Sequence, residues 1–220
     1  MEAKVASIFK SIQGEGKYVG SLQVFVRFFG CNLNCQFCDT KLEKFKIYNV
    51  NSLKKEVSSL RVKFLSLTGG EPLCQADFLK MFLESIAKDK FKIYLETNAT
   101  LYKNLKKVIK YIDIISFDLK LKSSTGGSQL WRVHEEFFKV AKLKEIFFKT
   151  VITTSTQFDD IKRLAGFLKD KLDYPLYLQP DSRYLSRRLL KKMFVFGEYL
   201  LNKGIDVRIV PQVHKFLNIE

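Results

Sequence analysis

Short, almost wholly apolar segments alternate with amphipathic ones along this sequence, and this alternation constrains the fold more than any other feature. Segments such as 23–28 (QVFVRF) and 146–152 (IFFKTVI) are typical of buried strands. Strands that are apolar throughout predict a parallel sheet covered on both faces. The expected strands are 23–28, 62–68, 92–96, 112–117, 146–152, 176–179 and 206–210.

Amphipathic segments that follow these strands complete a series of strand–helix units. The expected helices are 51–60, 75–88, 103–110, 130–142, 157–170 and 187–202. Right-handed crossovers of six such units form either an open sheet or a partial barrel, and both remain possible at this point. The chain holds only 4 prolines and no glycine-rich linker, so we expect one α/β domain over residues 1–220.

Polar and glycine residues gather where the expected strands end. In chain order they are Gly30-Cys31, Thr68-Gly69-Gly70-Glu71-Pro72, Glu96-Thr97-Asn98, Ser116-Phe117-Asp118-Leu119-Lys120 and Gln179-Pro180-Asp181. Helix capping accounts for some of these residues. Because the carboxyl ends of parallel strands meet at one edge of the sheet, we expect a single active face there.

The formal charge of +15 is the main feature of the composition. It favours a polyanionic partner such as nucleic acid, an anionic membrane or an acidic protein, although a compositional bias toward lysine would give the same number. Most phenylalanines fall inside the expected strands and helices, which argues against the exposed stacking surface of a nucleic-acid-binding protein. No apolar run reaches membrane-spanning length and the first residues lack a signal peptide's apolar stretch, so we expect a cytoplasmic protein.

Three of the four cysteines form a compact motif. Cys31, Cys35 and Cys38 are spaced C-x3-C-x2-C, while Cys74 stands apart and is expected to be a small buried hydrophobic residue. A disulfide framework does not suit a cytoplasmic chain, and structural zinc normally takes four ligands. Three thiolates on one loop fit a 4Fe-4S cluster with one iron left open, so this interpretation is favoured over zinc and over incidental buried cysteines.

This loop resembles the signature of the radical S-adenosylmethionine enzymes, because an aromatic residue, Phe37, precedes the third cysteine and the loop follows the first expected strand. Gly69-Gly70-Glu71 is similar to the GGE motif of that family, although a tight turn opening a helix at Pro72 would need similar residues. The resemblance implies a partial (β/α)6-type barrel whose open iron binds the methionine part of S-adenosylmethionine. The residues expected at this cofactor are Phe37, Gly69, Gly70, Glu71, Ser116, Asp118, Gln179 and Asp181.

Motifs near the two ends of the chain narrow the resemblance to the 7-carboxy-7-deazaguanine synthases. They are Ser-Ile-Gln-Gly-Glu-Gly at 11–16, Val-Arg-Phe at 26–28, Cys-Asp-Thr at 38–40, Glu-Thr-Asn at 96–98 and His-Lys-Phe-Leu-Asn at 214–218. The reaction implied is radical ring contraction of 6-carboxy-5,6,7,8-tetrahydropterin with loss of ammonia, on the path to queuosine-type bases. S-adenosylmethionine is regenerated in that family, which also uses Mg²⁺.

The same resemblance assigns residues to the substrate and to Mg²⁺. Arg27 suits the substrate carboxylate, because a guanidinium offers two parallel donors. Thr40 is the implied ligand of Mg²⁺. The other implied substrate residues are Ile12, Gln13, Gly14, Glu15, Thr68, Asn98, His214 and Glu220. Each of four residues also has a purely structural alternative: an ion pair for Arg27, a turn for Thr40, a helix cap for Glu15 and packing of the C-terminal tail for His214. His134 is expected on the surface.

The alternative function is an activase of a glycyl-radical partner, which shares the cysteine loop and the GGE motif. The implied partners are the pterin and an electron donor such as flavodoxin or ferredoxin, which we expect to dock near Lys41, Lys44 and Lys46. The family suggests a homodimer and requires no direct contact with nucleic acid.

Overall fold

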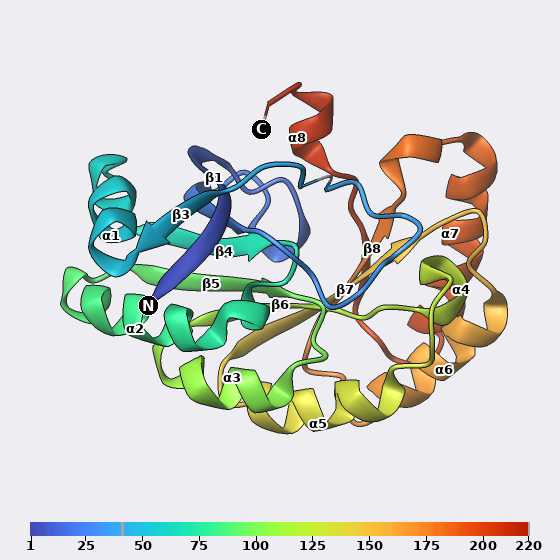
Figure 1. The fold of residues 1–220 in the computed structure, drawn as a ribbon. Coiled ribbons are helices and arrows are strands. Elements are labelled where there is room, and N and C mark those ends of the chain that lie inside the picture. Colours follow the sequence, from blue (N-terminus) through green and yellow to red (C-terminus); the bar gives the residue numbers. More distant parts are fainter. Residues whose placement is uncertain (41, 220) are drawn as a thin grey trace.

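A single open sheet organises the computed structural model, which describes residues 1–40 and 42–219. The strands lie in the order β3-β1-β2-β4-β5-β6-β7-β8-β9 (Figure 1). Their bounds are β1 Glu2–Ile12, β2 Leu22–Phe28, β3 Lys46–Asn49, β4 Phe64–Gly69, β5 Lys92–Thr97, β6 Ile114–Asp118, β7 Glu145–Ile152, β8 Leu176–Pro180 and β9 Val207–Ile209. The expected α/β class is confirmed, and the sheet is open, as a partial barrel is, because its outermost strands β3 and β9 are not paired with each other.

Strand direction divides the sheet into two parts. From β2 to β9 every neighbouring pair is parallel, as the apolar strands predicted. At the other edge, β1 pairs antiparallel with both β2 and β3. The sequence did not predict these two strands, which extend the expected parallel sheet by two antiparallel strands at this edge. β1 was not recognised as a strand because it mixes exposed and buried positions, as expected for a strand of which one face is not covered by a helix.

Most helices lie on the outer, convex face of the sheet (Figure 1). Their bounds are α1 Val50–Ser59, α2 Ala76–Ile86, α3 Tyr102–Val108, α4 Lys122–Thr125, α5 Trp131–Ala141, α6 Phe158–Leu168, α7 Arg187–Leu201 and α8 Val213–Phe216. The short helices α4 and α8 were not predicted. In the part of the chain that the structure describes, no helix combines the length and apolar character needed to cross a membrane.

Along the strands, the side chains on the inner face of the sheet change from apolar to polar. Toward the amino ends, Tyr94, Ile114, Phe147 and Tyr177 form a small buried cluster, separate from the large core under the helices. Farther along the same strands the inner positions hold Glu96, Ser116, Asp118, Lys149 and Gln179, which line a cavity. Since alternate residues of a strand point to the same face, each strand contributes an apolar floor and then a polar wall.

His134 on α5 is buried, so the expectation that it lies on the surface was wrong. It is 1% exposed, its Nε2 lies 3.3 Å from the carbonyl oxygen of Asn98, and its ring packs edge-on against Phe117 and Trp131. The polar residues of α5 concealed which side of the helix faces the sheet. Burial lowers the pKa of His134 to about 4.

This burial predicts a pH dependence of stability. Between pH 6.5 and 4 the unfolded chain binds a proton at residue 134 that the folded chain does not, so the free energy of unfolding falls as the pH falls through this window. The shift corresponds to about 3 kcal/mol. We expect His134→Leu to remove this part of the pH dependence, measured by urea unfolding at several pH values. Parallel wild-type and variant curves would contradict the assignment.

Candidate active site

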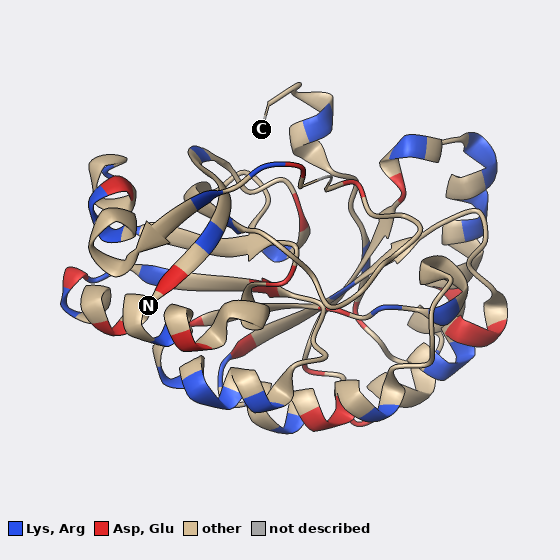
Figure 2. Cartoon of the chain, in the orientation of Figure 1, with Lys and Arg blue, Asp and Glu red and all other residues tan. Residues whose placement is uncertain are grey.

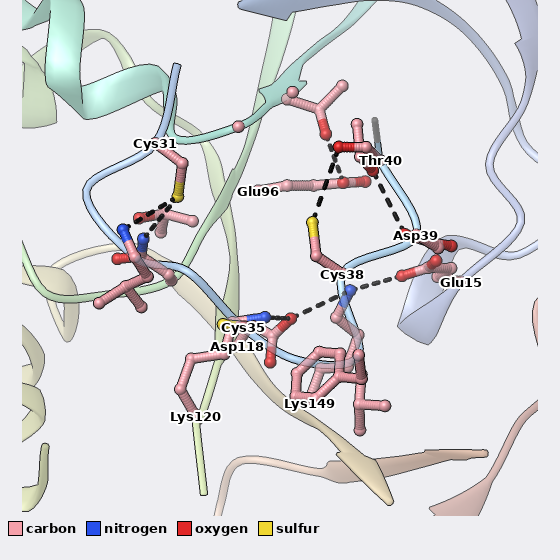
Figure 3. Close-up of a pocket in the computed structure, with 18 of the residues that line it drawn as sticks. Glu15, Cys31, Cys35, Cys38, Asp39, Thr40, Glu96, Asp118, Lys120 and Lys149 are labelled. Carbon is pink, nitrogen blue, oxygen red and sulfur yellow. Dashed lines mark hydrogen bonds and ion pairs between the residues drawn. The ribbon is translucent and has the colours of Figure 1, made fainter. Parts of the chain in front are cut away.

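The cysteine motif occupies the loop that leaves the carboxyl end of β2. Two backbone contacts fix its course: the Cys38 N–H donates to the Cys35 carbonyl at 3.0 Å, and the Gln36 N–H donates to the Thr125 carbonyl at the end of α4, also at 3.0 Å. The three thiols surround one open part of a cavity (Figure 3). The loop is therefore stabilised by a turn of its own and by a contact with the end of α4.

The arrangement of the thiols distinguishes between the metal sites considered from the sequence. Among the described residues, no three His, Cys, Asp or Glu side chains are grouped so that they could hold one metal ion. A structural zinc ion needs such a group, whereas each thiolate of a 4Fe-4S cluster binds a different iron. Three thiols of one loop that face a shared space fit the cluster better than a structural zinc ion. Burial raises the pKa of the Cys31 and Cys35 thiols.

The Gly69-Gly70 turn brings the end of β4 against the start of the cysteine loop. Gly69 has φ +122°, and a Cβ there would lie 2.2 Å from the Phe28 carbonyl oxygen. A Cβ on Gly70 would lie 2.0 Å from the carbonyl oxygen of Gly30. Only glycine permits this approach of two backbones. Both glycines line the cavity, so their backbone is available to a ligand.

Glu71 lies behind this turn and does not line the cavity. It is 0% exposed, and its carboxylate accepts hydrogen bonds from the N–H groups of Leu73 and Asn98 and from the Thr97 hydroxyl. Burial raises the pKa of Glu71 to about 7 despite these bonds. The side chain thus ties the turn to the end of β5, which is a positioning role different from the direct cofactor contact expected from the sequence.

The cavity bordered by the cysteines, here called the cluster cavity, has a volume of about 480 Å³. Of the expected cofactor residues it gathers Phe37, Gly69, Gly70, Ser116, Asp118, Gln179 and Asp181. Asp118 Oδ1 and Gln179 Oε1 are buried and have no hydrogen-bond partner within the described chain. Because buried polar atoms are normally paired, these two oxygens indicate a polar ligand at the cluster cavity.

A second cavity of about 530 Å³, here called the terminal cavity, adjoins the first and shares Glu15, Thr40, Thr68 and Glu96 with it. It gathers most of the expected substrate residues, namely Ile12, Gln13, Gly14, Glu15, Arg27, Thr68 and His214. Arg27 lies on β2 with its guanidinium 4.9 Å from the ring centre of Phe9. Thr40, the expected Mg²⁺ ligand, lies on the boundary between the two cavities.

The two terminal motifs meet at the terminal cavity. The Val213 N–H donates to the Gly14 carbonyl at 2.9 Å, and a Cβ on Gly14 would lie 2.0 Å from Nδ1 of His214. Gly14 therefore leaves room for the His214 ring, which packs directly on the N-terminal loop. Segments about 200 residues apart in the sequence form one wall of this cavity.

Lys149 on β7 connects the two cavities through a buried set of charges. Its ammonium contacts the Glu15 carboxylate and lies 3.5 Å from Asp118, which also pairs with Lys120 at 2.8 Å (Figure 3). On the far side of Glu15, the Gln212 amide donates to Glu15 at 2.6 Å and to Asp39 at 3.0 Å. Lys215 closes the set by pairing with Asp39 at 2.8 Å.

These contacts separate the pKa values of two neighbouring acids. Burial alone would raise the pKa of Glu15, but the Lys149 ammonium and hydrogen bonds from Lys149 and Gln212 lower it below its ordinary value. Burial and the charge of Glu15 raise the pKa of Glu96, although Lys149 opposes them. Burial would also lower the pKa of Lys149, yet the surrounding carboxylates raise it well above its ordinary value. Glu15 is thus an ionised acceptor, and Glu96 is the acid that more readily carries a proton.

Sequence reasoning missed Lys149, Glu96, Asp39 and Gln212 as members of the site. Lys149 had a visible signal, since it is the one charged residue within the apolar run IFFKTVI. Glu96 and Asp39 stand inside motifs that were noticed, but their roles were not assigned. Gln212 precedes the C-terminal motif and gave no signal of its own.

Asn98 and Cys74 lie elsewhere than the sequence led us to expect. Asn98 lines the cluster cavity instead of the terminal one, and its amide donates to Asn32 at 2.9 Å and lies 3.7 Å from the Cys31 sulfur. Cys74 is exposed, so its expected burial was wrong: the turn after Pro72 directs it outward. Glu220 and Lys41 lie outside the described residues.

Comparison with known proteins agrees with this geometry. Residues 25–125 match the Radical SAM superfamily. The 7-carboxy-7-deazaguanine synthase of Geobacter sulfurreducens is 33% identical, with 98% of this chain and 97% of that protein aligned. The enzyme of the same name from Archaeoglobus fulgidus is also 33% identical, over 100% of both chains.

The chain belongs to the 7-carboxy-7-deazaguanine synthase family. It is therefore a radical S-adenosylmethionine enzyme, and the family implies the cluster and the cofactor that the cluster cavity fits. The crystal structure of QueE from Escherichia coli has the same fold, with a TM-score of 0.66, 19% identity and coverage of 97% of this chain and 95% of that chain.

The buried charges predict the effect of removing Lys149. Lys149→Met leaves the buried carboxylate of Glu15 without its ammonium and leaves Asp118 paired only with Lys120, so we expect a loss of about 3–5 kcal/mol in the free energy of unfolding, measured with urea. Adding Glu15→Gln should recover part of this loss.

The first residue of the same strand supplies a matched control. Glu145 pairs with Lys17 at 2.6 Å, but both side chains are more than a third exposed. Lys17→Met should cost no more than about 1 kcal/mol. Equal losses for Lys17→Met and Lys149→Met would contradict the special role of the buried pair.

Proposed function

We propose that this chain converts 6-carboxy-5,6,7,8-tetrahydropterin to 7-carboxy-7-deazaguanine with loss of ammonia. The observation that carries the proposal is the terminal cavity, where an arginine and the two terminal motifs adjoin the cavity of the cysteines. Family membership gives the class of reaction, and the side chains in this cavity suit the chemistry of the proposed substrate.

The proposed cofactors fit the cluster cavity. Cys31, Cys35 and Cys38 would hold a 4Fe-4S cluster, and the unpartnered oxygens of Asp118 and Gln179 would accept hydrogen bonds from S-adenosylmethionine. When bound, this pair supplies the radical that removes hydrogen from the substrate. The protein's contribution is to hold the substrate beside the pair and to limit access of water.

Each part of the proposed substrate has a chemical match in the terminal cavity. The Arg27 guanidinium, held against the Phe9 ring, would bind the carboxylate through two donors. Glu15, kept ionised by Lys149, would accept from the ring N–H and amino groups together with the backbone of Ile12–Gly14. Glu96, which accepts hydrogen bonds from Gln13 and Thr68 at 2.7 Å each, would exchange a proton during loss of ammonia.

Several finer features belong to the same proposal. Thr40 and the neighbouring Asp39 line both cavities and would supply oxygen ligands to Mg²⁺, with the substrate carboxylate and water completing the shell. A homodimer and an external protein reductant are proposed from the resemblance alone, and a cytoplasmic location is proposed from the sequence. The continuous sheet from β1 to β9 supports treating residues 1–220 as one domain.

Product formation tests the proposal directly. The reconstituted protein is incubated without oxygen with dithionite, S-adenosylmethionine, Mg²⁺ and the carboxylated tetrahydropterin, and the products are followed by absorbance and mass. We expect the deazaguanine and ammonia in equal amounts. Cofactor cleavage without deazaguanine would reject the synthase and leave a radical enzyme of another kind, such as an activase.

A conservative substitution of Arg27 tests its proposed contact with the substrate carboxylate. Arg27→Lys keeps the charge but loses the two parallel donors, so we expect KM for the pterin to rise about tenfold or more while cofactor cleavage persists. Arg208→Lys, on β9 and more than half exposed, is the matched control and should behave as the wild type. An unchanged KM in Arg27→Lys would refute the carboxylate contact.

The cysteines of this chain offer a second matched pair. Cys35→Ala removes one of the three thiols of the loop, so we expect loss of the cluster, measured by iron and sulfide content and by electron paramagnetic resonance (EPR). Cys74→Ala removes an exposed thiol outside the loop and should keep a full cluster. Normal iron content in Cys35→Ala, or its loss in Cys74→Ala, would overturn the ligand assignment.

A further inference from the structure

Basic residues gather on the first turns of α7 and on the segment before it (Figure 2). They are Arg183, Arg187, Arg188, Lys191 and Lys192, and the sequence holds no acidic residue from 182 to 197. Residues 183–188 are all exposed. We call this surface the basic face of α7.

The basic face of α7 touches the cysteine loop. Arg183 Nη1 donates at 3.2 Å to the carbonyl of Gln36, the residue after Cys35. Asp181, which lines the cluster cavity, holds the same guanidinium through bonds of 3.0 and 2.8 Å. The charged surface and the proposed cluster site are therefore joined by direct contacts.

Exposed apolar residues accompany the charge. Tyr184 is 61% exposed, Leu185 42%, Phe194 57% and Val195 54%. Protein interfaces combine such apolar and aromatic contacts with a charged rim. A second copy of this chain would bring the same positive patch against itself in a two-fold interface, which like charges oppose. An acidic protein suits the basic face of α7 better than another copy does.

We propose that the basic face of α7 is the docking surface of an acidic one-electron donor protein, such as a flavodoxin, that reduces the cluster. The inference rests on the proposed function, because that function needs a reduced cluster. One electron leaves the donor and enters the 4Fe-4S cluster; the donor is oxidised, the cluster is reduced, and no bond forms or breaks. Opposite charge speeds the encounter, and contact with the cysteine loop shortens the path of the electron.

This surface differs from the one that the lysines of the sequence suggested. Lys41 lies outside the described residues, while Lys44 and Lys46 are exposed next to and at the start of β3, on the edge of the sheet opposite β9. Phe45 between them packs on Phe29, at the end of β2. The two surfaces can be tested against each other with variants of equal charge change.

The test measures how fast a reduced flavodoxin reduces the reconstituted cluster, followed by EPR at several salt concentrations. R187E/R188E is compared with K44E/K46E and with K103E/K106E, whose exposed lysines lie on α3 at the outer face. Arg187 and Arg188 open α7, where glutamate favours the helix, so R187E/R188E should fold normally. Reduction by dithionite, which needs no docking, shows that each cluster is competent.

We expect R187E/R188E to lower the rate with flavodoxin about tenfold at low salt and to weaken its salt dependence, with the dithionite reaction unchanged. K103E/K106E should retain the wild-type rate. A wild-type rate in R187E/R188E, an equal loss in K103E/K106E, or a larger loss in K44E/K46E would overturn the proposal. If R187E/R188E instead lost binding to tRNA, or no longer formed a dimer, while cluster reduction stayed unchanged, the surface would serve nucleic acid or a second copy, and the proposal would also be overturned.

The result is independent of the reaction that follows. Cluster reduction is read by EPR before any pterin is added. If no deazaguanine forms in the product assay while R187E/R188E still loses reduction, the proposed function fails and the docking surface stands.

Discussion

The buried pair of Lys149 and Glu15 is the interaction on which the arrangement of the site depends. Lys149 is 7% exposed and lies on the inner face of β7, next to the apolar cluster that contains Phe147 and at the point where the inner side chains become polar. An ammonium buried there is tolerated only if carboxylates approach it closely, and Glu15 comes from a loop outside the parallel strands. The pair therefore fixes the N-terminal loop against the sheet, and through Gln212 it fixes the C-terminal segment as well.

The parallel part of the fold could be predicted from local sequence because most of its strands, β2 and β4 to β8, are largely buried on both faces. The segment 146–152, for example, is apolar at almost every position and becomes β7 over Glu145–Ile152. β1 and β3 could not be found in this way. β3 is the edge strand and β1 lies between it and β2; exposed and buried residues alternate irregularly along β1, and the pairing of both strands is not evident from local sequence.

The candidate site likewise has a part that could be predicted from the sequence and a part that could not. The cysteine loop and the Gly69-Gly70 turn are contiguous motifs, so their chemistry is evident from the amino-acid sequence alone. The charged set joins residues 15, 39, 118, 149 and 212, which only the three-dimensional arrangement brings together. His134 and Cys74 show the same limit, because a residue's burial depends on what packs over it and not on its own polarity.

The contact of Gly14 with His214 also has a consequence for the order in which the protein is made. During synthesis the cysteine loop leaves the ribosome long before residues 212–219, which complete the wall of the terminal cavity. The terminal cavity therefore gains its last wall only after residues 212–219 have been made, so the site for the substrate is completed later than the loop of the three cysteines.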